Sequence, residues 1–132
     1  MTDGDVPSWV LDSSALLALL QNEPGAAVVR PAVDGAVISS VNWSEVVQKS
    51  LARGTEVAGL LEGLEAAGLT VLPFDADDAD LAARLWLETR SYGLSLGDRA
   101  CLATGLRARS PVLTADRSWT ALPLGVEVRS IR

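Results

Sequence analysis

Residues 9–20 read WVLDSSALLALL and residues 110–119 read SPVLTADRSW, and these two stretches decide the fold. Each contains a short apolar run that is typical of a buried strand and that ends at a polar residue. Asp12 follows the first run, whereas Thr114 and Asp116 follow the second. After Asp12 the apolar residues recur at helical spacing. Short strands that are apolar throughout and lead into helices are typical of a parallel sheet with both faces covered.

The rest of the chain repeats this alternation of strand and helix. Short apolar runs predict strands at residues 9–11, 36–38, 69–72, 112–113 and 126–128. Helical spacing and capping residues predict helices at residues 13–20, from about 22, from 39 or 40 to about 53, at 55–67, at 77–92 and at 95–109. We see no internal repeat and no linker. We therefore expect one α/β domain over residues 1–132, with a parallel sheet of about five strands, helices on both faces, and a flexible N-terminus at residues 1–8.

The composition excludes several classes of enzyme. The chain has 132 residues, 48% of them apolar, which is enough for the core of one domain. It has no histidine and one cysteine, which excludes Ser-His-Asp triads, Cys-His pairs and zinc sites with several Cys or His ligands. With 11 basic and 17 acidic residues, the net charge of −6 argues against non-specific binding of nucleic acid. An enzyme that meets phosphates through metal ions remains compatible with this charge.

The sequence predicts neither a membrane protein nor a secreted one. No stretch approaches the roughly 20 apolar residues of a transmembrane helix. The first residues, MTDGDVPSW, lack the basic start and the apolar run of a signal peptide. One cysteine cannot form a disulfide within the chain, which fits a reducing compartment. We expect a cytoplasmic protein without membrane contacts.

Four acidic residues stand where a parallel sheet places its ligand site. In such sheets ligands bind beyond the carboxyl ends of the strands. Asp12 and Asp116 follow predicted strands, whereas Glu45 and Asp98 lie near the starts of predicted helices. Carboxylates gathered at one edge would repel one another unless a cation lay among them. Oxygen-only ligands suit Mg²⁺ or Mn²⁺, so the four acids together predict a site for such an ion.

Each acid also has a structural interpretation when it is taken alone. Asp12 could cap the helix that follows it, and Asp116 could cap a short turn. Asp98 stands three residues after Ser95, which is the spacing of a capping box, although it shares its helix face with small and apolar residues. Glu45 stands four residues before the only lysine, which is the spacing of an exposed ion pair.

Four segments in this order carry a resemblance to a known family. They are VLDSSALLALL, SSVNWSEVVQKSL, LSLGDRACLATG and PVLTADRSW. Together they resemble the PIN-domain nucleases, and more closely the VapC-type ribonuclease toxins of toxin–antitoxin pairs. The resemblance runs from about Trp9 to Trp119.

The resemblance assigns roles to residues of this chain. It implies that Asp12, Glu45 and Asp98 are catalytic, metal-binding acids and that Asp116 is a fourth, more variable one. The hydroxyls and the amide expected to orient these acids are Ser13 or Ser14, Thr114 and Asn42. Two arginines that directly follow proposed acids, Arg99 and Arg117, are candidates for contacts with RNA phosphate.

The resemblance also implies an activity and partners. It implies metal-dependent hydrolysis of RNA with Mg²⁺ or Mn²⁺, which leaves 5′-phosphate and 3′-hydroxyl ends. A small cognate antitoxin would hold the toxin inactive by placing a basic side chain near the acidic pocket, and the protein would form a homodimer.

Two alternatives from other functional classes stay open at this point. One is a PIN-like module that binds RNA or a partner protein without cutting. The other is a receiver-type signalling domain, which would need a lysine late in the sheet, whereas the only lysine, Lys49, lies on a predicted helix.

Overall fold

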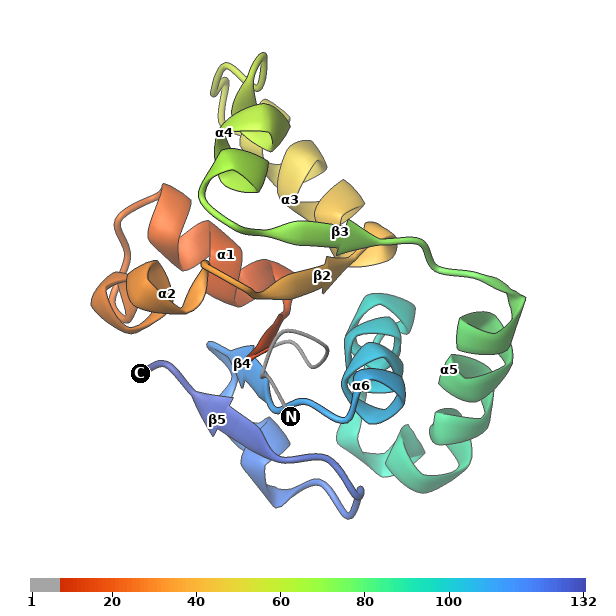
Figure 1. Ribbon diagram of the computed structural model, residues 1–132. Helices are drawn as coiled ribbons and strands as arrows, with labels where there is room; N and C mark the ends of the chain where they lie inside the picture. Colours follow the sequence, from red (N-terminus) through yellow and green to blue (C-terminus); the bar gives the residue numbers. More distant parts are fainter. Residues whose placement is uncertain (1–7) are drawn as a thin grey trace, which may run out of the picture.

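The computed structural model describes residues 8–132, so all but the last residue of the predicted flexible N-terminus lies outside the described residues (Figure 1). Within that range, parallel strands form one five-stranded sheet in the order β3-β2-β1-β4-β5. The strands are β1 (Val10–Leu11), β2 (Val37–Ser39), β3 (Thr70–Leu72), β4 (Val112–Thr114) and β5 (Val128–Ser130). The helices are α1 (Ser13–Leu20), α2 (Ala26–Ala32), α3 (Ser40–Ala52), α4 (Leu60–Ala66), α5 (Ala76–Thr89) and α6 (Leu96–Ala108), with short 3₁₀ helices η2 (Arg90–Tyr92) and η3 (Arg117–Ala121).

The strand order excludes the receiver-type alternative. Receiver domains have the order 2-1-3-4-5, in which the third strand lies next to the first. Here β1 lies between β2 and β4, and β3 is an edge strand. The prediction of a parallel α/β sheet is confirmed, and the signalling-domain alternative is wrong.

The two faces of the sheet carry separate apolar cores. Successive residues of a strand point to opposite faces, so Val10 packs in one core and Leu11 in the other. Helices α1 to α4 contribute to the core around Leu11, whereas α5, α6 and η3 contribute to the core around Val10. Figure 1 shows α1 and α2 on one side of the sheet and α5 and α6 on the other. The predicted placement of helices on both faces is confirmed.

Three predicted elements start two or more residues later in the structure than the sequence predicts. The helix expected from about residue 22 begins at Ala26, after Gly25 with a φ of 99°. The helix expected at 55–67 begins only at Leu60, because Gly59 has a φ of 77° and no right-handed helix passes through that conformation. The fifth strand lies at Val128–Ser130 and not at 126–128, because its pairing with β4 aligns Val112 with Val128. Among residues 8–132, no helix combines the length and the apolar character needed to cross a bilayer.

The parallel sheet brings three strand ends to one edge. Leu11 aligns with Leu113, and the amide of Asp12 donates to the carbonyl of Leu113 at 3.2 Å. The amide of Ile131 donates to the carbonyl of Thr114 at 2.9 Å. The ends of β1, β4 and β5 therefore lie side by side, with Asp12 next to the chain that leads to Asp116.

Candidate active site

Asp12 is a buried carboxylate held by three hydrogen-bond donors. Its side chain is 5% exposed and caps the first turn of α1, where its Oδ1 accepts from the amide of Ala15 at 2.8 Å. The Ser14 hydroxyl donates to Oδ1 at 2.7 Å and also lies 2.9 Å from Oδ2. The Thr114 hydroxyl, at the end of β4, donates to Oδ2 at 2.6 Å. Two strands and one helix start therefore fix the orientation of this one carboxylate.

Burial makes Asp12 a weaker acid than an exposed aspartate. The pKa of Asp12 is raised from 3.8 to about 6, chiefly by the loss of solvation and to a smaller extent by the negative charge of Asp98. The hydrogen bonds from Thr114, Ala15 and Ser14 act in the opposite direction, but they do not cancel the effect of burial. The three donors therefore stabilise the ionised carboxylate only in part, and a nearby positive charge would stabilise it further.

Glu45 is held by a neighbour on its own helix. The Asn42 side-chain amide donates to Glu45 Oε1 at 2.9 Å and to the carbonyl of Gly97 on α6, also at 2.9 Å. Asn42 is 1% exposed, and its Oδ1 is buried with no hydrogen-bond partner among the described residues. No ion pair between Glu45 and Lys49 is found in residues 8–132, so the alternative of an exposed ion pair is not realised.

Asp98 forms the capping box that its spacing predicts. The Ser95 hydroxyl accepts from the amide of Asp98 at 3.1 Å, and Asp98 Oδ2 accepts from the amide of Ser95 at 2.9 Å. This places the carboxylate in the first turn of α6, where the positive end of the helix dipole favours negative charge. The structural interpretation of Asp98 is thus confirmed, but it leaves the second carboxylate oxygen available for another role.

The buried thiol of Cys101 lies within electrostatic reach of three of the acids. Burial raises the pKa of the Cys101 thiol, and the charges of Asp12, Asp98 and Glu45 raise it further, in that order. Cys101 stands one helical turn after Asp98 and is fully buried. The carboxylates of Asp12 at the end of β1, Glu45 on α3 and Asp98 on α6 are therefore close enough to this thiol to act on it electrostatically.

Asp116 lies beside this group but is more exposed. Its amide donates to the Thr114 hydroxyl at 3.1 Å, which links it to the residue that holds Asp12. Its carboxylate caps η3 and accepts from the amide of Ser118 at 2.9 Å and from the Ser118 hydroxyl at 2.6 Å. The predicted cap is confirmed, and the side chain is directed to its own turn.

The remaining predicted residues differ in what they contact. Ser14 and not Ser13 bonds to Asp12, while Ser13 is buried in the first turn of α1. Arg99 Nη1 donates to the carbonyl of Ala82 at 2.8 Å, so this guanidinium is joined to α5. Arg117 is exposed, and its Nε donates to the carbonyl of Arg132 at 2.7 Å. Of the two arginines, Arg117 is the one presented at the surface next to Asp116.

The donors fit a hard divalent cation, although they do not converge on one point. In residues 8–132, no three or more acidic, cysteine or histidine side chains are arranged closely enough to hold an ion. Glu45 and Asp98 each bond to a local donor, Asn42 Nδ2 and the Ser95 amide respectively. The nearby acids nevertheless supply only carboxylate oxygens, which Mg²⁺ and Mn²⁺ prefer, and no arginine or lysine of residues 8–132 forms an ion pair with the buried Asp12.

Comparison with known proteins decides the family. The sequence model of the PIN domain matches residues 9–123, which is most of the chain. The chain belongs to the PIN-domain family. A search of curated proteins gives no significant match. The resemblance that the four sequence segments indicated is confirmed.

Solved structures similar to this PIN domain include toxin–antitoxin complexes. A toxin–antitoxin complex from Klebsiella pneumoniae has a TM-score of 0.72 at 22% identity, over 95% of this chain and 98% of that one. VapBC-5 from Mycobacterium tuberculosis, a toxin–antitoxin system of the VapBC family, has a TM-score of 0.58 at 26% identity, over 96% and 99%. A DNA-bound VapBC from Salmonella typhimurium has a TM-score of 0.65 at 18% identity, over 96% and 99%. The PIN domain therefore spans nearly the whole length of these chains.

Sequence reasoning missed one residue of this site. Gly97 directly precedes Asp98, and its carbonyl accepts from Asn42, which also holds Glu45. The only signal in the sequence is a small residue in the first turn of a helix, where glycine is a poor helix former.

Proposed function

We propose that this PIN domain is a metal-dependent endoribonuclease and the toxin of a toxin–antitoxin pair. The observation that carries the proposal is the buried Asp12 at the sheet edge, with Glu45 and Asp98 close enough to act on the same thiol. In residues 8–132, no ion pair with an arginine or lysine neutralises any of these three acids. Such a group of acids favours a cation, and the family match supports a nuclease.

Asp12, Glu45 and Asp98 would hold Mg²⁺ or Mn²⁺, with Asp116 as a further ligand on the more exposed side. The bound ion would supply the acidified water and the positive charge that phosphodiester hydrolysis needs at neutral pH. Ser14 and Thr114 hold both oxygens of Asp12, and Asn42 holds Glu45, so these three residues fix the orientation of two ligands. This arrangement explains how a chain without histidine could cut RNA.

The proposed RNA substrate and antitoxin partner are supported by an exposed arginine, by the acidic residues of the site and by the similar structures. Arg117 lies exposed beside Asp116 and is the better placed of the two arginines to contact an RNA phosphate; Arg99 would have to leave its bond to Ala82. The similar structures named above are toxin–antitoxin complexes, which supports a small antitoxin as the partner of this chain. Acids that no arginine or lysine of residues 8–132 neutralises favour a partner that brings a basic side chain to them. We also propose that the protein is a homodimer and that it is located in the cytoplasm.

The charge of Asp98 tests the assignment of the site. We expect Asp98→Asn to lower the rate of RNA cleavage with Mg²⁺ by at least about 100-fold, because it keeps the shape of the side chain and removes a proposed ligand charge. The measurement is the initial rate of cleavage of a defined RNA with Mg²⁺ and with EDTA.

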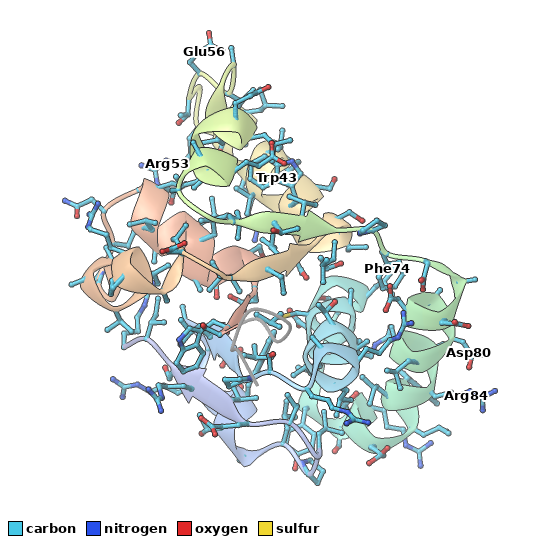
Figure 2. The ribbon with its side chains drawn as sticks, viewed as in Figure 1. Trp43, Arg53, Glu56, Phe74, Asp80 and Arg84 are labelled. Carbon is cyan, nitrogen blue, oxygen red and sulfur yellow. The ribbon has the colours of Figure 1, made fainter. Side chains whose placement is uncertain are left out.

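Asp80→Asn is the matched control for this substitution. Figure 2 shows Asp80 and Arg84 on the outer side of α5, where they form an exposed ion pair at 2.7 Å. Asp80→Asn should therefore cut at the parental rate. Equal rates for Asp98→Asn and the parent would show that the site is wrongly assigned. Binding of RNA without any cleavage by the parent would favour the non-catalytic module.

The Asn42 amide provides a second test. We expect Asn42→Ala to lower cleavage by about 10- to 100-fold, because Glu45 loses the donor that holds it. The free energy of unfolding should fall by about 1–3 kcal/mol, since a buried side chain and its hydrogen bonds are lost. Gln48→Ala, which removes an exposed amide from the same helix, should change neither quantity. Parental activity in Asn42→Ala would rule out a role for this amide in holding Glu45.

A further inference from the structure

Gly97 is a glycine whose backbone conformation does not require one. It is the second residue of α6, is buried, and does not have the positive φ that favours glycine at six other positions of the described chain. In a helix, glycine is less favourable than alanine by about 1 kcal/mol. The reason for a glycine here must therefore lie in the space around it.

The carboxylate of Glu45 occupies that space. A Cβ at position 97 would lie 2.8 Å from Glu45 Cδ and 2.9 Å from Oε1, and it would lie closer still to Oε2. All three contacts are with the far end of one side chain, and that side chain can move. The helical Gly63 on α4 differs, because a Cβ there would meet nothing within 4 Å. A methyl group at position 97 is thus compatible with the backbone but not with the position of Glu45.

Asn42 fixes Glu45 against the backbone of α6 at this point. Both of its partners, the Glu45 carboxylate and the Gly97 carbonyl, can only accept hydrogen bonds, so the amide nitrogen must face them. The amide therefore joins α3 to the residue directly before Asp98. Any displacement of Glu45 by a side chain at position 97 would stretch this bridge and move the carboxylate relative to Asp98.

We propose that Gly97 is a positioning residue: the missing side chain leaves the space that lets Glu45 stand beside Asp98. This inference rests on the proposed function, in which both acids hold a divalent cation. A methyl group at position 97 displaces Glu45 and weakens binding of the cation, while the fold is kept.

The test compares Gly97→Ala with Gly63→Ala in the full chain, using Mn²⁺ alone as the probe. We expect Gly97→Ala to weaken Mn²⁺ binding, measured by calorimetric or electron-paramagnetic-resonance titration, by about 10-fold or more. Its unfolding temperature in EDTA should stay close to that of the parent, because the gain from alanine in a helix offsets the weakened hydrogen bond between Asn42 and Glu45. Gly63→Ala should bind Mn²⁺ as the parent does. Equal Mn²⁺ affinity in Gly97→Ala and the parent would overturn the inference.

A double-mutant cycle with Glu45→Ala covers the case in which Gly97→Ala folds poorly. Without the Glu45 side chain no clash remains, so Gly97→Ala should cause no further loss of Mn²⁺ affinity in that background. An equal loss in both backgrounds would mean that Gly97 acts other than through Glu45, which overturns the inference. A parent that neither binds Mn²⁺ nor cuts RNA would instead refute the proposed function, and the inference with it.

Discussion

Asp12→Asn is expected to abolish RNA cleavage and, at the same time, to stabilise the metal-free protein. Cleavage should fall by at least about 100-fold, since a central ligand charge is lost, and even the loss of a hydrogen bond to a ligand costs about 10- to 100-fold. The free energy of unfolding in EDTA at pH 7 to 8 should rise by up to about 3 kcal/mol. This figure follows from the rise of the Asp12 pKa from 3.8 to about 6, at about 1.4 kcal/mol for each pH unit.

The geometry favours asparagine as the replacement. Its carbonyl oxygen can accept from Ala15 and Ser14 as Oδ1 does, and its amide nitrogen can donate to the Thr114 hydroxyl. Cleavage rates and urea unfolding in EDTA measure the two effects. Asp80→Asn, the exposed control on α5, should change neither. A variant that is less stable than the parent at pH 7 to 8, or that cuts RNA normally, would contradict this account of Asp12.

The gain in stability from Asp12→Asn is expected to depend on pH. Because the folded state raises the pKa of Asp12, the folded protein binds this proton more tightly than the unfolded chain does. The parent therefore keeps this contribution below about pH 4 and loses it as the pH rises to about 6. The difference between variant and parent should be near zero at pH 4 and reach its full value above pH 6.

The difference in the free energy of unfolding between the variant and the parent does not contain the contributions of the other titrating groups, because both proteins share them. The pKa of Asp75, for example, is lowered chiefly by the hydrogen bond from the Asp78 amide, so its contribution is lost as the pH falls. Both proteins share that contribution, and it cancels. Urea unfolding of both proteins in EDTA, at pH values from 4 to 8, measures how this difference depends on pH. A difference that does not vary with pH would show that burial does not raise the pKa of Asp12.

The sequence predicted the sheet because its strands are short and apolar at every position. Val10 and Leu11 face different cores, so both must be apolar, and this pattern indicates a parallel sheet with helices on both faces. The bounds were less predictable where the backbone decides them. Nothing in the composition of residues 55–67 shows that Gly59 adopts a left-handed conformation. The register of β5 is set by its pairing with β4, and the apolar pattern of residues 126–128 alone does not determine it.

The sequence predicts the acids and the types of residue that orient them, whereas it does not predict which serine bonds to Asp12 or the role of Gly97. For Asp98, the capping box with Ser95 does not exclude the proposed metal role, because the capping carboxylate lies within electrostatic reach of Asp12. A cap fixes where a carboxylate points, so the two roles are compatible. The choice of Ser14 over Ser13 and the space at Gly97 depend on side-chain directions across separate elements.

The most direct test of the central claim is the chemistry of the RNA ends. Total RNA is treated with the parent protein and Mg²⁺ or Mn²⁺, with EDTA and with the Asp98→Asn variant, and the new ends are mapped by ligation and sequencing. Metal-dependent hydrolysis at these carboxylates predicts new 5′-phosphate and 3′-hydroxyl ends. These ends should not form in the presence of EDTA or with the Asp98→Asn variant. Cyclic-phosphate ends, or cleavage that persists in EDTA, would contradict the account.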